Sequence, residues 1–131
     1  DMDRVCHFEI PYTDKSRAEK FYQDVFGWQI SPAPGDMPYS FAITTPVDEK
    51  FQPPQAGGLN GGMYQRGEEG SQTPVVVIDA ESCEQRGADI QKAGGSLVMG
   101  PAKVGDMGIY AQVKDCEDNI IGLWQQLGPM G

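Results

Sequence analysis

The chain has little of the chemistry that most catalytic and metal-binding sites use. Its 131 residues include a single histidine, His7, and only three cysteines, Cys6, Cys83 and Cys116. The cysteines form no CxxC pair and show no zinc-type spacing with His7, which argues against a zinc site built from Cys and His. We interpret them as reduced thiols, with Cys6 and Cys83 packing as small apolar groups.

Basic residues and long apolar runs are also scarce. Ten Lys and Arg stand against 19 Asp and Glu, for a formal net charge of −9, and no basic cluster interrupts the acidic balance. Nucleic acids and anionic membrane surfaces repel such a chain, so we expect neither as a partner. No stretch approaches the ~18 apolar residues of a membrane helix, and the N-terminus lacks the apolar core of a signal peptide. We therefore expect a cytoplasmic protein.

The chain does contain one sequence pattern that occurs twice. An alternating segment from Val5 to Ile10 is followed by a helical stretch and Gly27, and a second from Val75 is followed by a helical stretch and Gly94. From His7 to Gly27 is 20 positions, and from Val75 to Gly94 is 19. Three further extended segments follow each helical stretch. The repeat predicts an α+β domain of two βαβββ modules, residues 4–66 and 74–127, joined by an exposed, flexible linker at 67–73.

The alternation in the first strand assigns its two faces. His7 and Glu9 share one face, and Phe8 and Ile10 share the other, up to Pro11, where we expect the strand to end. The next stretch places an apolar stripe at helical spacing, which we expect to cover the face of Phe8 and Ile10: Ala18, Phe21, Tyr22, Val25 and Phe26. His7 and Glu9 then face away from the helix.

These segments resemble the vicinal oxygen chelate superfamily, which includes glyoxalase I, the bleomycin-resistance proteins and extradiol dioxygenases. The resemblance runs from Val5 to Leu127. The stretches that carry it are His7-Phe8-Glu9-Ile10-Pro11 with Asp14, Ala18 with Phe21-Tyr22, Val25-Phe26-Gly27-Trp28, Gly57-Gly58-Leu59-Asn60-Gly61-Gly62, Ala93-Gly94-Gly95, and Asp115 to Trp124.

The resemblance implies that the two modules curl their strands into a U-shaped, partly open barrel with a central cavity inside and the helices outside. It also implies where the family's metal enzymes hold a divalent ion, with His or Glu ligands on the first and fourth strands of each module. The first of these four positions falls on His7. The second falls between Gly57 and Arg66, where no Asp, Glu, His or Cys occurs, and the others fall on Val75 and Gly122.

Three of the four family ligand positions are therefore lost. Glu9 lies on the same strand face as His7, about 7 Å away between Cα atoms, and could add a second ligand. On the opposite side of the cavity, Val75 and Gly122 would supply no ligand. A divalent ion is held usefully by three or four protein ligands. We expect no metal cofactor, with His7 as the only candidate ligand.

The same carry-over predicts which residues line the cavity. We expect an apolar, aromatic site for a small molecule, lined by His7, Glu9, Phe41, Asn60, Val75, Val77, Tyr110 and Trp124. Because one residue of register reverses a strand, Tyr39 or Phe41 and Met63 or Tyr64 stay alternatives for the walls.

Each polar candidate has a structural reading beside the functional one. His7 is either a catalytic group or a core histidine that bonds to a backbone carbonyl. Glu9 is either catalytic or structural, and as a buried carboxylate it needs a partner, namely His7, Arg4 or a ligand. Trp124 either stacks on a ligand or packs in the core.

Three functions are consistent with these residues. The first is a metal-free binder of a small aromatic or amphipathic molecule, which we expect to be a homodimer. The second is an enzyme of the glyoxalase or dioxygenase kind, a lyase, isomerase or oxidoreductase that uses His7 and Glu9 with or without a metal. The third is an interaction protein with a filled core. A fold by itself does not choose among them.

Overall fold

The computed structural model describes residues 2–34, 38–47 and 56–128. Its helices and strands repeat the doubled pattern. The first half contains β1 (Val5–Tyr12), α1 (Lys15–Phe26), β2 (Gln29–Pro32), β3 (Tyr39–Ile43) and β4 (Gly61–Gln65). The second half contains β5 (Val75–Asp79), α2 (Cys83–Lys92), β6 (Ser96–Val104), β7 (Gly108–Lys114) and β8 (Ile120–Gln126).

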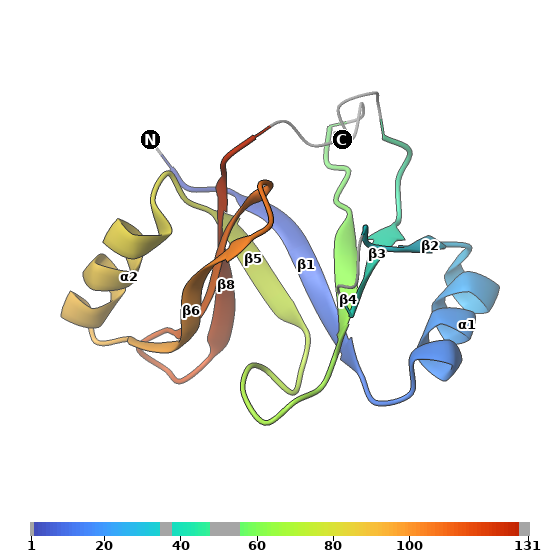
Figure 1. The fold of residues 1–131 in the computed structure, drawn as a ribbon, viewed down its shortest axis with the longest axis horizontal. Coiled ribbons are helices and arrows are strands. Elements are labelled where there is room, and N and C mark those ends of the chain that lie inside the picture. Colours follow the sequence, from blue (N-terminus) through green and yellow to red (C-terminus); the bar gives the residue numbers. More distant parts are fainter. Residues whose placement is uncertain (1, 35–37, 48–55, 129–131) are drawn as a thin grey trace.

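All the strands belong to one eight-stranded sheet in the order β2-β3-β4-β1-β5-β8-β7-β6. The strands β1 and β5 pair antiparallel at its centre, and α1 and α2 lie at opposite ends of the molecule (Figure 1). The sheet does not close, because β2 and β6 remain its edges. The predicted α+β class and partly open architecture are confirmed. We call the sheet face turned away from the helices the inner face.

The register at the centre relates the two halves by an approximate two-fold axis. His7 pairs with Val77 and Glu9 pairs with Val75, so exchanging the halves places His7 on Val75 and Glu9 on Val77. Each first strand also runs parallel to the fourth strand of its own half. There Glu9 lies beside Gly62 and Val77 lies beside Gly122, which makes the two glycines equivalent.

Each helix covers its own apolar cluster on the outer face. The side chain of Asp14 accepts a hydrogen bond from the Arg17 amide at 3.1 Å and caps α1, which ends at Gly27 with a φ of 72°. One cluster is built around Tyr12, Ala42 and Met63, with Phe8, Ile10, Ala18, Tyr22, Trp28 and Ile30 packed against it. The other is built around Cys83, Ala111, Val113 and Leu123, with Ile78, Ile90, Ile109 and Ile121 against it. The outward placement of Phe8 and Ile10 is confirmed.

Only part of the apolar stripe on α1 packs against the sheet. Ala18 and Tyr22 pack inward, but Phe21, Val25 and Phe26 are 53%, 59% and 59% exposed, so the predicted burial of the whole stripe is wrong. The ring of Trp28 stacks on Tyr22 with 4.7 Å between centroids. Because Trp28 fills the space beside Tyr22, less of the helix reaches the sheet.

One expectation about a chain break is also wrong. The strand β1 continues through Pro11 to Tyr12, because its pairing with β5 ends at Glu9 and the missing Pro11 N–H interrupts no ladder on that side. The segment at 67–73, which we expect to be an exposed, flexible linker, is exposed at most of its residues, but its Ser71 is 2% exposed. Its amide donates to Gln112 Oε1 at 2.9 Å, and its carbonyl accepts from Tyr64 Oη at 2.8 Å.

In the part of the chain that the structure describes, neither helix has the length and apolar character that a membrane span needs.

Candidate functional site

Glu9 lies at the centre of the inner face and is 6% exposed. Two phenols donate hydrogen bonds to its carboxylate: Tyr39 Oη to Oε2 at 2.9 Å, and Tyr110 Oη to Oε1. The tyrosines come from β3 and β7, on opposite sides of the central strands. The expectation that His7 or Arg4 would be the direct protein partner of Glu9 is therefore wrong, because the partners reach it from more distant strands.

His7 joins the same cluster through Tyr39. Its Nε2 lies 2.8 Å from Tyr39 Oη. A phenol has one proton, and that of Tyr39 is directed to Glu9, so His7 must donate from Nε2, and its Nδ1 is left as an acceptor. Neither sequence-based reading of His7 included a phenol: its partner is a tyrosine rather than a backbone carbonyl.

The arrangement on the other side is similar. Gln112, 2% exposed, donates from Nε2 to Tyr110 Oη at 2.8 Å, and its Oε1 accepts from the Ser71 amide. We call His7, Tyr39, Glu9, Tyr110 and Gln112 the Glu9 network. Because its members come from β1, β3 and β7 and it reaches Ser71, the network connects both halves of the chain with the segment between them.

The electrostatics of the network follow from burial. Burial raises the pKa of Glu9, and the hydrogen bonds from Tyr110 and Tyr39 lower it in part. Burial lowers the pKa of His7 to about 4, so the imidazole is neutral at pH 7. Burial and the charge of Glu9 raise the pKa values of both tyrosines. The two phenol O–H groups that donate to Glu9 suit an ionised carboxylate, which only accepts hydrogen bonds. None of the ion pairs found among the described residues includes Glu9.

Two glycines make room for the tyrosines. A Cβ atom on Gly62 would lie 1.8 Å from Tyr39 Oη, so the phenol occupies the space of any side chain there. A Cβ atom on Gly122 would lie 3.0 Å from Val77 Cγ2 and 3.3 Å from Tyr110 Oη. Gly62 and Gly122 are equivalent under the two-fold relation, and so are Tyr39 and Tyr110: Tyr39 pairs with Tyr64, two residues after Gly62, and Tyr110 pairs with Trp124, two residues after Gly122.

These glycines are also the fourth-strand positions at which the resemblance expects metal ligands. The four expected positions are thus His7, Gly62, Val75 and Gly122, and only His7 carries a donor. Val75 is 1% exposed and apolar. Across residues 2–34, 38–47 and 56–128, no three His, Cys, Asp or Glu side chains gather closely enough to hold a metal ion. This residue set does not fit a divalent cation, which needs three or four such ligands.

Most of the other predicted cavity residues lie on the inner face near the Glu9 network, but one does not. Phe41 packs edge to face on Tyr39 with 6.0 Å between centroids, and Trp124 lies directly opposite Tyr110, so both belong to the inner face. Val75 and Val77 form its buried floor at 1% exposure each. Asn60 lies apart: its Oδ1 accepts from the Thr44 and Thr45 amides at 2.7 and 3.0 Å.

Sequence reasoning missed Tyr39 as a partner of Glu9, and Gln112 and Ser71 altogether. The alternation Tyr110–Gln112 on β7 was a usable signal, because it puts a buried amide on the same face as Tyr110.

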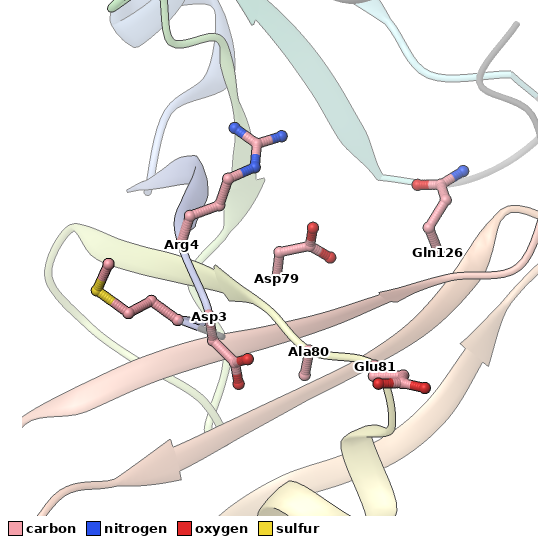
Figure 2. Close-up of a pocket in the computed structure, with 7 residues that line it drawn as sticks. Asp3, Arg4, Asp79, Ala80, Glu81 and Gln126 are labelled. Atoms are coloured by element: carbon pink, nitrogen blue, oxygen red, sulfur yellow. The ribbon is translucent and has the colours of Figure 1, made fainter.

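Two pockets formed by described residues lie away from the Glu9 network. One, of about 360 Å³, is lined by Met2, Asp3, Arg4, Asp79, Ala80, Glu81 and Gln126 (Figure 2). The other, of about 300 Å³, lies beside α2 and β6. Neither contains a residue of the predicted central cavity. On the inner face, the phenols of Tyr39 and Tyr110 reach across the sheet and bind Glu9.

Comparison with known proteins gives a consistent picture. Residues 4–44 match a family model described as bleomycin resistance protein-like N-terminal. The putative glyoxylase CFP32 of Mycobacterium tuberculosis and that of Mycobacterium bovis are each 28% identical over 120 residues, which cover 89% of this chain. The chain spans only 43% of the length of these curated relatives. A glyoxylase-like domain-containing protein of Didymella fabae is 50% identical over 38 residues, or 28% of this chain and 30% of that protein.

Solved structures share the fold at low sequence identity. Streptomyces coelicolor methylmalonyl-CoA epimerase, in complex with 2-nitronate-propionyl-CoA, aligns with a TM-score of 0.64 at 14% identity, covering 100% of this chain and 99% of that one. The Mycobacterium tuberculosis methylmalonyl-CoA epimerase aligns with a TM-score of 0.59 at 15% identity, covering 95% and 88%.

Proposed function

Because the chain belongs to the vicinal oxygen chelate superfamily, we propose that it binds a small molecule on the inner face of its sheet, without the divalent ion of the family's metal enzymes. One observation carries the metal-free part of the proposal: phenols that bind Glu9 cover the two glycines at the fourth-strand ligand positions. The aromatic side chains of the inner face remain partly exposed beside this buried polar centre. Apolar walls with a few placed polar groups are typical of small-molecule sites.

The metal part of the proposal is tested by mass spectrometry of the purified protein. The protein is incubated with Zn, Ni, Mn and Fe(II) in turn and then desalted. We expect no retained ion. About one ion per chain, lost in His7→Ala, would contradict the proposal, because it would show that His7 finds further ligands. Glu117→Gln, an exposed acidic site, controls for nonspecific binding of cations by an acidic surface.

The binding part is tested by thermal unfolding against a library of aromatic and amphipathic compounds. We expect some of them to raise the melting temperature of the wild-type protein, since a ligand that binds only the folded state stabilises it. The same compounds should perturb NMR signals of Tyr39, Phe41, Tyr110 and Trp124. A library that shifts neither the melting temperature nor these signals would refute the proposal.

A second candidate function rests on a separate observation. His7, Tyr39 and Glu9 form a continuous hydrogen-bonded path, with 2.8 and 2.9 Å between successive heavy atoms. When Nδ1 of His7 takes a proton from a substrate, this path can pass the Nε2 proton to Tyr39 and the Tyr39 proton to Glu9, as a metal-free isomerase or lyase requires. If turnover of a substrate is found, Tyr39→Phe should reduce kcat, because it breaks the path while keeping the ring. Turnover that persists in both Tyr39→Phe and His7→Ala would eliminate this function.

A further inference from the structure

We propose that two copies of this chain associate through the outward side of α1, with the two helices antiparallel across a two-fold axis. The sequence predicts a homodimer without indicating which surface forms it. The surface that we assign consists of Phe21, Val25 and Phe26, and we call it the α1 patch. Because α1 covers the outer face of the sheet, the proposal does not depend on what the inner face binds.

The α1 patch exposes side chains that a helix on a sheet normally turns inward. All three are more than half exposed, and no residue of α1 is fully buried. The rings of Phe21 and Phe26 lie edge to face with 6.2 Å between centroids, and Phe26 continues onto Trp28 at 6.0 Å. The exposed side chains therefore form a continuous surface. Continuous apolar surfaces of this kind often mark interaction sites.

The helix α2 shows that the fold itself does not require such a patch. It follows β5 as α1 follows β1, and Figure 1 shows the two helices at opposite ends of the molecule. None of the large apolar side chains that are exposed among the described residues lies on α2, whereas Cys83 and Gly87 of that helix are fully buried. The apolar outward side of α1 is thus a property of this helix alone, which indicates a partner outside the monomer.

Charge favours α1 as the place where two copies meet. The chain carries a net charge of −9, so two copies repel each other over most of their surface. The helix α1 is an exception, with three basic residues, Lys15, Arg17 and Lys20, against the acidic Glu19 and Asp24. The repulsion between two copies is therefore smallest where their α1 helices meet.

The side chains beside the patch are also self-complementary. Lys20 and Asp24 form an exposed ion pair, in a row of the helix adjacent to Phe21 and Val25. In an antiparallel pair centred between Phe21 and Val25, Lys20 of each copy faces Asp24 of the other. Such a two-fold contact covers the α1 patch of both copies at once, whereas a head-to-tail contact would leave one patch exposed. A second copy of this chain is therefore the occupant that fits.

The size of the patch sets the expected affinity. Its three side chains expose roughly 300 Å² of apolar surface, whereas a standard stable interface buries about 800 Å² per partner. The patch is large enough for the apolar core of an interface, and the charged side chains of α1 suit its polar rim. Because the core is small, we expect a reversible dimer with a dissociation constant on the order of 10 μM.

The test is sedimentation velocity over a concentration series that brackets this dissociation constant. The wild-type protein should show a reversible equilibrium between monomer and dimer. Val25→Glu should raise the dissociation constant at least about tenfold, because it places a carboxylate in the apolar core of the interface. Ala88→Glu adds the same charge at an exposed position of α2, and as the matched control it should leave the constant within about twofold of wild type.

A charge exchange tests the antiparallel arrangement. Lys20→Glu should weaken the dimer, because it places a carboxylate opposite Asp24 of the second copy. Combining Lys20→Glu with Asp24→Lys should restore association, because the exchanged charges are again complementary across the axis. All the substituted side chains are exposed, so the variants should fold. Circular dichroism spectra and melting temperatures verify this.

Three outcomes would overturn the proposal. A wild-type protein that stays monomeric throughout the series would show that the α1 patch does not serve self-association. A dimer that Val25→Glu leaves intact, or that Ala88→Glu weakens equally, would show that the interface lies elsewhere. A dimer that is lost in Lys20→Glu and is not restored by the added Asp24→Lys would refute the antiparallel two-fold arrangement.

Discussion

Gly62→Ala is the substitution that most directly tests the arrangement at the centre of the sheet. The added methyl group would lie 1.8 Å from Tyr39 Oη and 2.1 Å from Tyr39 Cζ. Real Cβ atoms do not approach other atoms so closely, so the phenol must leave its place. When it leaves, Glu9 loses one of its two donors and His7 loses its partner.

The magnitude follows from these losses. A hydrogen bond to a charged group contributes ~1.5–3 kcal/mol, and a neutral one contributes ~1 kcal/mol. Alanine in a strand is more favourable than glycine by ~0.5–1 kcal/mol, which offsets part of the loss. We therefore expect a net destabilisation of about 2–3 kcal/mol, or a fall in melting temperature of roughly 10 °C for a domain of this size.

The assay is urea and thermal unfolding followed by circular dichroism, with Gly67→Ala as the matched control. The nearest atom to a Cβ on Gly67 is the Glu69 carbonyl oxygen, 3.9 Å away, so this variant should stay within ~0.5 kcal/mol of wild type. In a Tyr39→Phe background, where the hydroxyl is already absent, Gly62→Ala should cost less than in the wild type. A Gly62→Ala protein as stable as wild type would show that Tyr39 does not hold Glu9 in solution.

Four further predictions concern other parts of the molecule. Burial lowers the pKa of His7 from 6.5 to about 4, so the unfolded chain takes up this proton at a higher pH than the folded one. The free energy of unfolding should therefore fall as the pH drops across that range, and His7→Gln should remove ~3 kcal/mol of that fall in urea titrations. Gln112→Ala should cost about 2–3 kcal/mol by the same method, because it leaves buried partners unpaired, whereas the exposed Gln91→Ala should be neutral. A thiol reagent at pH 8 should label exposed Cys116 rapidly and the other two cysteines slowly, since one is buried and burial raises the pKa of Cys6 to about 11; equal rates would contradict this. Light scattering should give twice the chain mass if the predicted homodimer forms.

The strand faces were predictable because they depend on local periodicity. Alternation placed His7 and Glu9 together, and helical spacing assigned Phe8 and Ile10 to the helix side. Both placements agree with the structure, since Phe8 and Ile10 pack under α1 while Glu9 binds phenols on the other face. The repeat itself was enough to predict the class of fold.

The partners of Glu9 were not predictable, because they depend on register across several strands. Tyr39 reaches Glu9 over β4, and Tyr110 reaches it over β5 and β8. A one-residue shift in the pairing of β3 would turn the phenol of Tyr39 to the outer face, and a one-residue shift in the pairing of β7 would do the same to Tyr110. A sequence pattern shows which face of a strand an aromatic ring lies on, but not how far the ring reaches across that face.

The approximate two-fold axis has a consequence for the number of protons at the centre of the sheet. Two equivalent phenols supply two protons, and both go to one carboxylate, while the residue equivalent to Glu9 is Val77. A second carboxylate at that position would compete with Glu9 for the same two protons and would add a second buried negative charge. The duplicated sheet therefore has hydroxyl protons for only one acid, and the halves of the chain must differ at this point for the arrangement to form.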